Sequence, residues 1–329
     1  MDTSMKKIIY ILIIVAVICL GAVYFTWQKA QKPEIETQKP SLSWVEVAKA
    51  ADILKIEIVP YEDPTLIYKE WRQVRDYLAK KLNMEIQLRV ARDYRAAIND
   101  IGLGVVDVAY LTPVTYTEAR KDYCVQPLVS PIGQENQSVF DCLLIAREDS
   151  GINSVSDLRG KSFAYGDEKS TCGTLMAHKW LKEADIEYPS QQGRVQYFPN
   201  YNAVIQTLIS GEFQAGAVRK SVFDKVSHPG IKIVKSEKIM ADSVLVGTFD
   251  LGTGLKGRIV QALLEMDIKT PASKSILTAI NPEYIGWRTE NDEMYSSFKT
   301  LIKEIHGLDY TIAADYCLIK PKCKLAAKK

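Results

Sequence analysis

The sequence predicts an α/β protein with two lobes joined by two crossings, preceded by an N-terminal transmembrane or signal helix. Segments with strand and helix patterns alternate along most of the chain, as in open sheets whose helices cover both faces. Two apolar runs, 138–146 and 243–248, interrupt this order and suit crossings between the lobes. A charge-free run near the N-terminus is a third, separate feature. We therefore expect a clamshell that closes on a ligand by hinge motion.

Length and charge narrow the function classes. The chain has 329 residues, which favours two domains or lobes over one core. Lys and Arg total 42 against 40 Asp and Glu, a net charge of +2, so bulk charge does not indicate a nucleic-acid partner. His178, His228 and His306 are the only histidines, and none is spaced for metal ligation. No glycine-rich phosphate loop indicates a nucleotide, so no cofactor or metal is expected.

The N-terminal run indicates contact with a membrane. Lys6 and Lys7 precede residues 8–27, which carry no charge and at about 1.5 Å per residue can span roughly 30 Å of hydrocarbon. We favour an uncleaved anchor over a removed signal, because no small-x-small cleavage site follows. Residues 28–51 are polar and proline-punctuated, which suits a tether. The folded part is then expected on the periplasmic or extracellular face, anchored in the cytoplasmic membrane or secreted after cleavage.

The first half of the folded part alternates between strand and helix. Asp93 is a helix cap and Gly104 a helix breaker, while apolar residues recur at helical spacing after Pro64. The expected strands are 53–60, 85–90 and 105–111. The expected helices are 66–82, 93–103 and one that begins at 113, with a loop at 125–137.

The second half repeats the pattern before returning to the first lobe. The expected elements are a short helix at 156–160, strands at 161–165, 194–198, 215–218 and 231–235, and helices at 172–184, at 200–210 and through 226. Helices at 256–265, 273–278 and 292–305 are expected to pack back on the first lobe. We therefore assign 52–141 and 246–329 to lobe 1 and 142–245 to lobe 2.

The stretch Tyr165 to Leu181 joins a strand to a helix through a polar loop. Its hydroxyl-rich segment, 170–174, falls at the helix start, where unpaired backbone N–H groups and the helix dipole favour an anion. The alternative is a local helix cap, since Ser and Thr are favoured there for hydrogen bonds within the turn. These residues alone favour the cap.

The cysteines leave the disulfide pattern open. In an oxidising compartment Cys317 and Cys323 can close a C-terminal loop, and Cys124 can pair with Cys142. Cys172 has no obvious partner, and we interpret it as a small side chain at a helix start rather than a nucleophile.

Five segments carry a family resemblance. They are ARDYRAAI (91–98), VVDVAYLTPVTY (105–116), REDSGINSVSDLRGKSFAYGD (147–167), STCG (170–173) and NAVIQTLISGEFQAGAV (202–218). In this order and spacing, residues 53–298 resemble the phosphonate, phosphite and phosphate substrate-binding proteins of bacterial ABC transporters. The resemblance implies a periplasmic-binding-protein clamshell of the type II-like class. It also implies a small anionic ligand and an ABC permease as partner.

The resemblance implies a site at the helix start. Ser170 and Thr171 match a family Ser-Thr-Ser run that holds anionic oxygens, and Cys172 replaces its third member. Tyr94 matches an aromatic residue that donates from the opposite lobe. With this match, ligand contact becomes favoured over a simple cap for Ser170 and Thr171.

Other matched positions depart from the family. Phe140 lacks the hydroxyl of a family tyrosine, and Tyr201 stands in place of a ligand-binding histidine. Asp242 matches one of two acids that hold an amine, whereas Ser221 replaces the other. Each of these residues also has an alternative role without ligand contact. Phe140 can be a core residue, and Asp242 can lie in a surface loop. Tyr94 and Tyr201 can pack at helix starts. Arg219 faces either the cleft or solvent, and solvent is favoured.

Three function classes follow. The favoured one is a solute-binding protein that captures a small oxyanion of the phosphonate, phosphite or phosphate type for an ABC transporter. The alternative is a membrane-anchored ligand-sensing or accessory protein for a different small ligand, which the anchor would also suit. An enzyme is disfavoured, because the sequence lacks an arranged nucleophile and base and has no cofactor motif.

Overall fold

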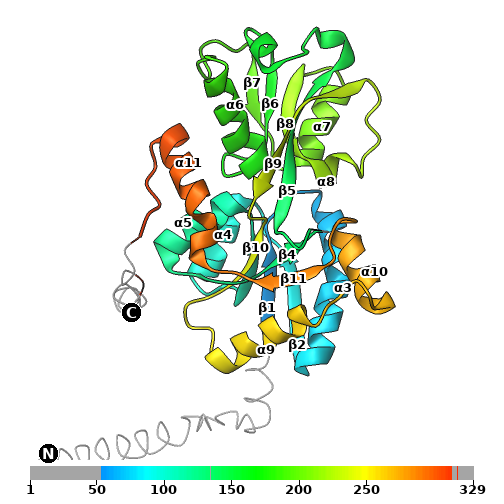
Figure 1. The fold of residues 1–329 in the computed structure, drawn as a ribbon, viewed down its shortest axis with the longest axis vertical. Coiled ribbons are helices and arrows are strands. Elements are labelled where there is room, and N and C mark those ends of the chain that lie inside the picture. The colour runs from blue at the N-terminus through cyan, green and yellow to red at the C-terminus, as the bar shows by residue number, and fades with distance from the viewer. Residues whose placement is uncertain (1–52, 134, 313–316, 318–329) are drawn as a thin grey trace, which may run out of the picture. The chain divides into compact units, whose positions relative to one another are not determined.

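A computed structural model describes residues 53–133, 135–312 and 317 (Figure 1). The predicted membrane run at 8–27, the tether at 28–51 and Cys323 lie outside these residues. Among the described helices, none combines the length and apolar character that a membrane span needs.

Lobe 1 is built on a six-stranded sheet of order β11-β4-β10-β3-β1-β2. Its strands are β1 (Ile53–Ile58), β2 (Glu85–Val90), β3 (Val108–Leu111), β4 (Gln126–Ile132), β10 (Val244–Gly247) and β11 (Gly286–Thr289). β1 pairs in parallel with β2 and β3, whereas β10 is antiparallel to β3 and β4. The adjacent residues Glu57 and Ile58 of β1 point to opposite faces of the sheet and are both buried, as expected for a strand covered on both faces.

Helices cover this first sheet. They are α3 (Pro64–Leu82), α4 (Tyr94–Gly102), α5 (Pro113–Tyr123), α9 (Thr253–Leu264), α10 (Pro271–Ile280), the 3-10 turn η4 (Asp292–Tyr295) and α11 (Ser296–His306). In α3 the predicted apolar stripe is buried, and the Asp63 side chain accepts from the Thr65 N–H at 2.8 Å to cap the helix. The parallel strands β1, β2 and β3 lead into α3, α4 and α5, so the loops before these three helices lie at the same edge of the sheet.

Lobe 2 is built on a five-stranded sheet of order β7-β6-β8-β5-β9. Its strands are β5 (Val139–Arg147), β6 (Phe163–Tyr165), β7 (Val195–Tyr197), β8 (Ala215–Arg219) and β9 (Ile231–Met240). Its helical elements are η1 (Glu148–Ser150), η2 (Val155–Leu158), the π-helical η3 (Thr171–Met176), α6 (Ala177–Glu183), α7 (Tyr201–Ile209) and α8 (Lys220–Phe223). The chain passes from the first sheet to the second between β4 and β5, and returns between β9 and β10 (Figure 1).

The loop predicted at 125–137 is wrong for most of its length, because β4 lies there between β10 and β11. Pro127 and Pro131 made the segment resemble a loop, since proline cannot donate to a ladder. The structure accommodates Pro127 beside a register shift at Leu245 and Val246 of β10. The third strand is also shorter than predicted, because residues 105–107 form a turn.

The disulfide expectations are also wrong. The structure pairs Cys142 with Cys172 and Cys124 with Cys317, with Cα–Cα distances of 5.1 and 5.4 Å that suit disulfides. Cys172 therefore has a disulfide partner, Cys142, and the spacing of the cysteines in the sequence did not indicate this pair. Cys142 lies on β5, which η3 contacts within the same lobe. Disulfide bonds agree with an oxidising, extracytoplasmic compartment.

Polar contacts join the two lobes. The Lys225 ammonium of lobe 2 lies 3.0 Å from Glu62 and 2.6 Å from Glu70 of lobe 1. On another side, His178 Nδ1 of α6 lies 3.0 Å from His306 Nε2 of α11. The loops at the strand ends therefore meet in a closed arrangement, and the groups described next are buried between them.

Candidate ligand-binding site

The helix start predicted to bind an anion forms a wide π-helical turn. Ser170 is its N-cap, and its Oγ accepts from the Gly173 N–H at 3.0 Å. The Leu175 N–H reaches back five residues to the Ser170 carbonyl at 3.1 Å. π-Helical turns occur frequently at functional sites. The local cap and the anion hypothesis therefore coexist, because Ser170 caps the turn and still presents its hydroxyl.

A glycine pair brings the loop after β6 close to this turn. A Cβ at Gly173 would lie 2.7 Å from the Gly166 Cα and 2.8 Å from the Gly166 N, which no side chain tolerates. The Gly166 N–H donates to the Gly173 carbonyl at 3.1 Å. Glycine is therefore required at position 173, and the close approach fixes the turn against the carboxyl end of β6.

Four hydroxyl side chains meet at this turn: Tyr94, Ser170, Thr171 and Tyr201, which we call the hydroxyl cluster. The Ser170 Oγ and the Tyr201 hydroxyl are 2.9 Å apart, and both groups lie close enough to the Tyr94 phenol to act on its pKa. The backbone of Cys172 lies close enough to the Tyr201 phenol to lower its pKa. Each of the four side chains is at most 2% exposed. Two lobes thus contribute hydroxyl groups to one buried point.

The two phenols of the cluster stay neutral over the physiological range. Burial raises the pKa of Tyr94 well above its ordinary value, and the nearby Tyr201 raises it further. Burial also raises the pKa of Tyr201, although its bond with Ser170 acts in the opposite direction. Since a neutral phenol keeps its proton, both side chains can donate to an anionic oxygen.

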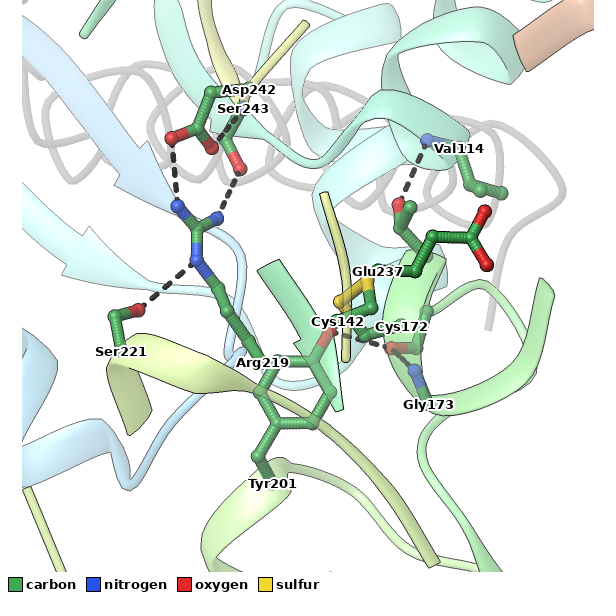
Figure 2. Close-up of a disulfide and its surroundings, with 12 residues drawn as sticks. Val114, Cys142, Cys172, Gly173, Tyr201, Arg219, Ser221, Glu237, Asp242 and Ser243 are labelled. Atoms are coloured by element: carbon green, nitrogen blue, oxygen red, sulfur yellow. Dashed lines mark hydrogen bonds and ion pairs between the residues drawn. A yellow bond between two sulfur atoms is a disulfide. The ribbon is translucent and has the colours of Figure 1, made fainter. Parts of the chain in front are cut away.

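A second helix start, from lobe 1, faces the same point. The Val114 N–H, in the first turn of α5, donates to the Thr171 Oγ1 at 3.4 Å (Figure 2). Thr112 caps α5, its Oγ1 accepting from the Thr115 N–H. The N-terminal ends of two helices, each with positive partial charge, therefore converge on Thr171. Sequence analysis had not assigned Val114 to the site, because it contributes its backbone alone.

An open groove of about 440 Å³ runs beside the hydroxyl cluster. Its walls carry chain neighbours of Tyr94 and Ser170, among them Arg92, Arg95 and Lys169. Acidic residues of the same walls, including Asp93 and Asp167, balance these cations. The groove has mixed charge and adjoins the site through these chain neighbours.

A second buried group, the arginine cluster, surrounds Arg219 at the end of β8. It comprises Phe140, Arg219, Ser221, Asp242, Ser243 and Tyr284. The Arg219 Nη2 lies 2.8 Å from Asp242 Oδ2, and the guanidinium carbon lies 4.4 Å from the Phe140 ring centroid. Figure 2 shows the guanidinium between Ser221 on one side and Asp242 with Ser243 on the other.

One expectation is wrong here, and one alternative is excluded. Arg219 is 7% exposed and does not point into solvent, and Asp242 is fully buried rather than in a surface loop. Burial works against the Arg219 charge, but Asp242, Tyr284 and Tyr110 together outweigh it, so the pKa of Arg219 lies above its ordinary value. Arg219 therefore keeps its charge and forms a desolvated ion pair with Asp242.

A disulfide connects the two clusters. In the antiparallel ladder of β5 and β8, Cys142 pairs with Arg219. Cys142 is bonded to Cys172, which lies at the start of η3 beside Ser170 and Thr171 (Figure 2). Because Cys172 is oxidised, it has no thiol to donate and contributes its backbone N–H instead.

The expected site residues are thus placed in two neighbouring groups. Tyr94, Ser170, Thr171, Cys172 and Tyr201 meet at the hydroxyl cluster, and Phe140, Ser221 and Asp242 meet around Arg219. Tyr284 and Ser243 were missed. Tyr284 is 65 residues from Arg219 in the chain and carries no local signal. The role of all these residues in ligand binding stays a prediction.

A family model matches most of the folded part of the chain. Residues 56–295 match the model of a family described as ABC transporter, phosphonate, periplasmic substrate-binding protein. A probable ABC transporter phosphite-binding protein of Prochlorococcus marinus is 24% identical over 248 residues, covering 70% of this chain and 82% of that relative.

Two solved structures share the fold. The Prochlorococcus marinus protein in complex with methylphosphonate has a TM-score of 0.71 at 20% identity, covering 78% of this chain and 99% of that one. A binding-protein component of an ABC phosphonate transporter from Pseudomonas aeruginosa has a TM-score of 0.72 at 15% identity, covering 84% of this chain and 96% of that one. These structures match the two-lobed α/β architecture predicted from the sequence.

Proposed function

The chain belongs to the family of periplasmic substrate-binding proteins of phosphonate ABC transporters, and from that premise we propose that it captures a small phosphorus oxyanion at the hydroxyl cluster. Membership makes it an extracytoplasmic solute-binding protein that works with an ABC transporter. The ligand class is the proposal: a phosphonate, phosphite or phosphate. Relatives named for phosphite and solved with methylphosphonate support it.

The main support for the oxyanion proposal is that several neutral hydrogen-bond donors meet at one buried point. Ser170, Thr171, Tyr94 and Tyr201 supply hydroxyls, and Cys172 supplies a backbone N–H. Fixed dipoles can replace the hydration shell of an anion without bringing a counter-ion. On binding, these hydroxyls would donate to a ligand oxygen in place of the contacts that they now make with one another across the lobes.

Isothermal titration calorimetry tests this proposal. Wild-type protein is titrated with methylphosphonate, phosphite, phosphate and sulfate, and at least one phosphorus oxyanion is expected to bind. The double variant Ser170→Ala/Thr171→Ala is expected to bind it at least thirtyfold more weakly, because each hydrogen bond to a charged group contributes about 1.5–3 kcal/mol.

Thr270→Ala is the matched control. Thr270 caps α10 as Ser170 caps η3, its Oγ1 accepting from the Ser273 N–H at 3.3 Å, but it lies away from both clusters. It is expected to lose stability without losing affinity. Absence of binding for all four anions, or equal affinity of the double variant and wild type, would contradict the oxyanion proposal.

Two finer expectations accompany the proposal. We infer that residues 8–27 keep the protein on the membrane, and N-terminal sequencing of the membrane fraction checks this: a chain that begins after residue 27 would contradict it. The family is one of transport substrate-binding proteins, which is not an enzyme class. We expect no turnover, and release of orthophosphate from bound methylphosphonate would overturn that expectation.

A further inference from the structure

Partners within the protein occupy three of the about four acceptor sites of the Asp242 carboxylate. Its Oδ2 accepts from Arg219 Nη2 and from the Tyr284 hydroxyl, both at 2.8 Å. Its Oδ1 accepts from the Ser243 N–H. The side chain is fully buried, so solvent offers no further partner. An ionised carboxylate in this position is stabilised by Arg219 and its neighbours, and a new cation would have to displace one of them.

Arg219 is held as completely as its partner. Its Nε–H donates to Ser221 Oγ at 3.1 Å, and Nη1 donates to Ser243 Oγ at 3.2 Å. Nη2 donates to Asp242 and to the Tyr284 hydroxyl at 2.9 Å. Four of the five N–H donors of a guanidinium are therefore used within the protein. The charge of Arg219 balances Asp242 and is not free to serve as the main counter-ion of a ligand.

The ion pair lies directly beside the hydroxyl cluster. Arg219 is close enough to act on the ionisation of Tyr201, whose hydroxyl belongs to that cluster. The Cys142–Cys172 disulfide ties the strand position opposite Arg219 to the start of η3. A substituent that extends from an oxyanion held at Ser170 toward Arg219 would therefore meet a carboxylate that is already neutralised.

We propose that Arg219 is a specificity-determining residue that restricts the site to oxyanions without a cationic substituent. By neutralising Asp242, it leaves a buried ammonium group without a partner, which costs affinity. Alkyl phosphonates, phosphite and phosphate fit this site, whereas aminoalkyl phosphonates do not. This inference rests on the proposed function and deepens it.

A matched pair of probes tests the proposal. Ethylphosphonate and 2-aminoethylphosphonate differ only by the ammonium group, so the ratio of their Kd values reports discrimination independently of a uniform loss of affinity. Calorimetry with wild-type protein is expected to show at least a tenfold preference for ethylphosphonate. Arg219→Gln frees the Asp242 carboxylate and is expected to shift the ratio at least tenfold toward 2-aminoethylphosphonate.

Further variants test whether the charge of Asp242 sets this ratio of Kd values. Arg219→Gln/Asp242→Asn removes both charges and is expected to return the ratio toward the wild-type value. Asp242→Asn alone leaves Arg219 uncompensated, so the preference for ethylphosphonate is expected to widen at least fivefold. Arg194→Gln is the control: Arg194 also pairs with a carboxylate, Glu212, and lies over an aromatic ring, but on the exposed surface of lobe 2. It should leave the ratio unchanged.

The outcomes separate this inference from the proposed function. If wild type binds ethylphosphonate and 2-aminoethylphosphonate equally, or if folded Arg219→Gln keeps the wild-type ratio, the inference is wrong while oxyanion capture stands. If Arg219→Gln does not fold, an unchanged ratio in Asp242→Asn overturns it. If wild type binds no phosphorus oxyanion at all, the proposed function fails and this inference fails with it.

Discussion

The hydroxyl cluster and the arginine cluster lie side by side, joined by one disulfide, but they differ in how they hold charge. The hydroxyl cluster brings together neutral phenols, hydroxyls and a backbone N–H. The arginine cluster holds one guanidinium and one carboxylate that satisfy each other. The first can therefore accept a charge from outside, whereas the second is already balanced. Both clusters are buried, so burial does not distinguish them, whereas the charge that each cluster already holds does.

The largest expected effect concerns the balanced cluster. Arg219→Met leaves Asp242 ionised, buried and unpaired, which is expected to lower the free energy of unfolding by about 3–5 kcal/mol in urea denaturation. Arg194→Met removes a pair whose side chains are 57% and 44% exposed, and should cost under about 1 kcal/mol. Equal losses for the two variants would show that the Arg219 pair is not desolvated, and would remove the contrast between the clusters.

The next largest effect on stability is expected from the disulfide that connects the two clusters. Replacing Cys142 and Cys172 together by alanine removes a disulfide between residues separated by 30 positions in the chain. This change is expected to lower the free energy of unfolding by about 3–4 kcal/mol. Because Cys172 also fixes the turn that carries Ser170, oxyanion affinity should fall. Replacing Cys124 and Cys317 is the control that should cost stability and spare affinity. Equal affinities for the two double variants would contradict the link.

His178 and His306 form a pair between the lobes, and lowering the pH can protonate it. Burial, aided by His306, lowers the pKa of His178 to about 4. Between pH 6.5 and about 4 the unfolded chain then binds more protons than the native one, so stability falls as pH falls. This contribution amounts to about 2 kcal/mol between pH 7.5 and pH 5.

The pH effect must be measured as a difference between proteins. Burial raises the pKa of Glu57 and Glu70 to about 7, and these native carboxyl groups retain protons that the unfolded chain loses, which favours stability at lower pH. Subtracting the pH profile of His178→Gln from that of wild type isolates the histidine. Parallel profiles for the two proteins would show that His178 does not titrate with a lowered pKa.

The smallest expected effect on stability comes from the neutral cluster. Tyr201→Phe removes the hydroxyl that contacts Ser170 and the Cys172 N–H, at a cost of about 1 kcal/mol of stability. Oxyanion affinity should fall about tenfold. Tyr77→Phe loses a comparable bond to the Ala262 carbonyl, 2.8 Å long and remote from the site, and should keep full affinity. Similar affinities for the two variants would exclude Tyr201 from ligand contact.

The parts that sequence reasoning predicted are those with a local signal. The apolar stripe of α3 and the cap at Ser170 depend on residues within one or two turns of each other, so periodicity and capping chemistry suffice. The family motifs then added Tyr94 from the other lobe. Most strands were predicted in the same way from their own apolar patterns, but β4 and β11 were not.

The parts that were missed depend on contacts between distant segments. Arg219 meets Asp242 and Tyr284 across 23 and 65 residues, and nothing near Arg219 in the chain indicates that solvent is excluded there. The partner of Cys172 is likewise set by the packing of η3 on β5. For β4, two prolines hid a strand that its neighbours β10 and β11 stabilise.

The most direct measurement is a crystal structure of the protein with methylphosphonate. The account predicts phosphonate oxygens at hydrogen-bond distance, about 2.6–3.1 Å, from Ser170 Oγ and Thr171 Oγ1. It also predicts that Arg219 remains paired with Asp242. A phosphonate bound to the Arg219 guanidinium, with Asp242 released and Ser170 uninvolved, would contradict the central claim that neutral donors hold the anion.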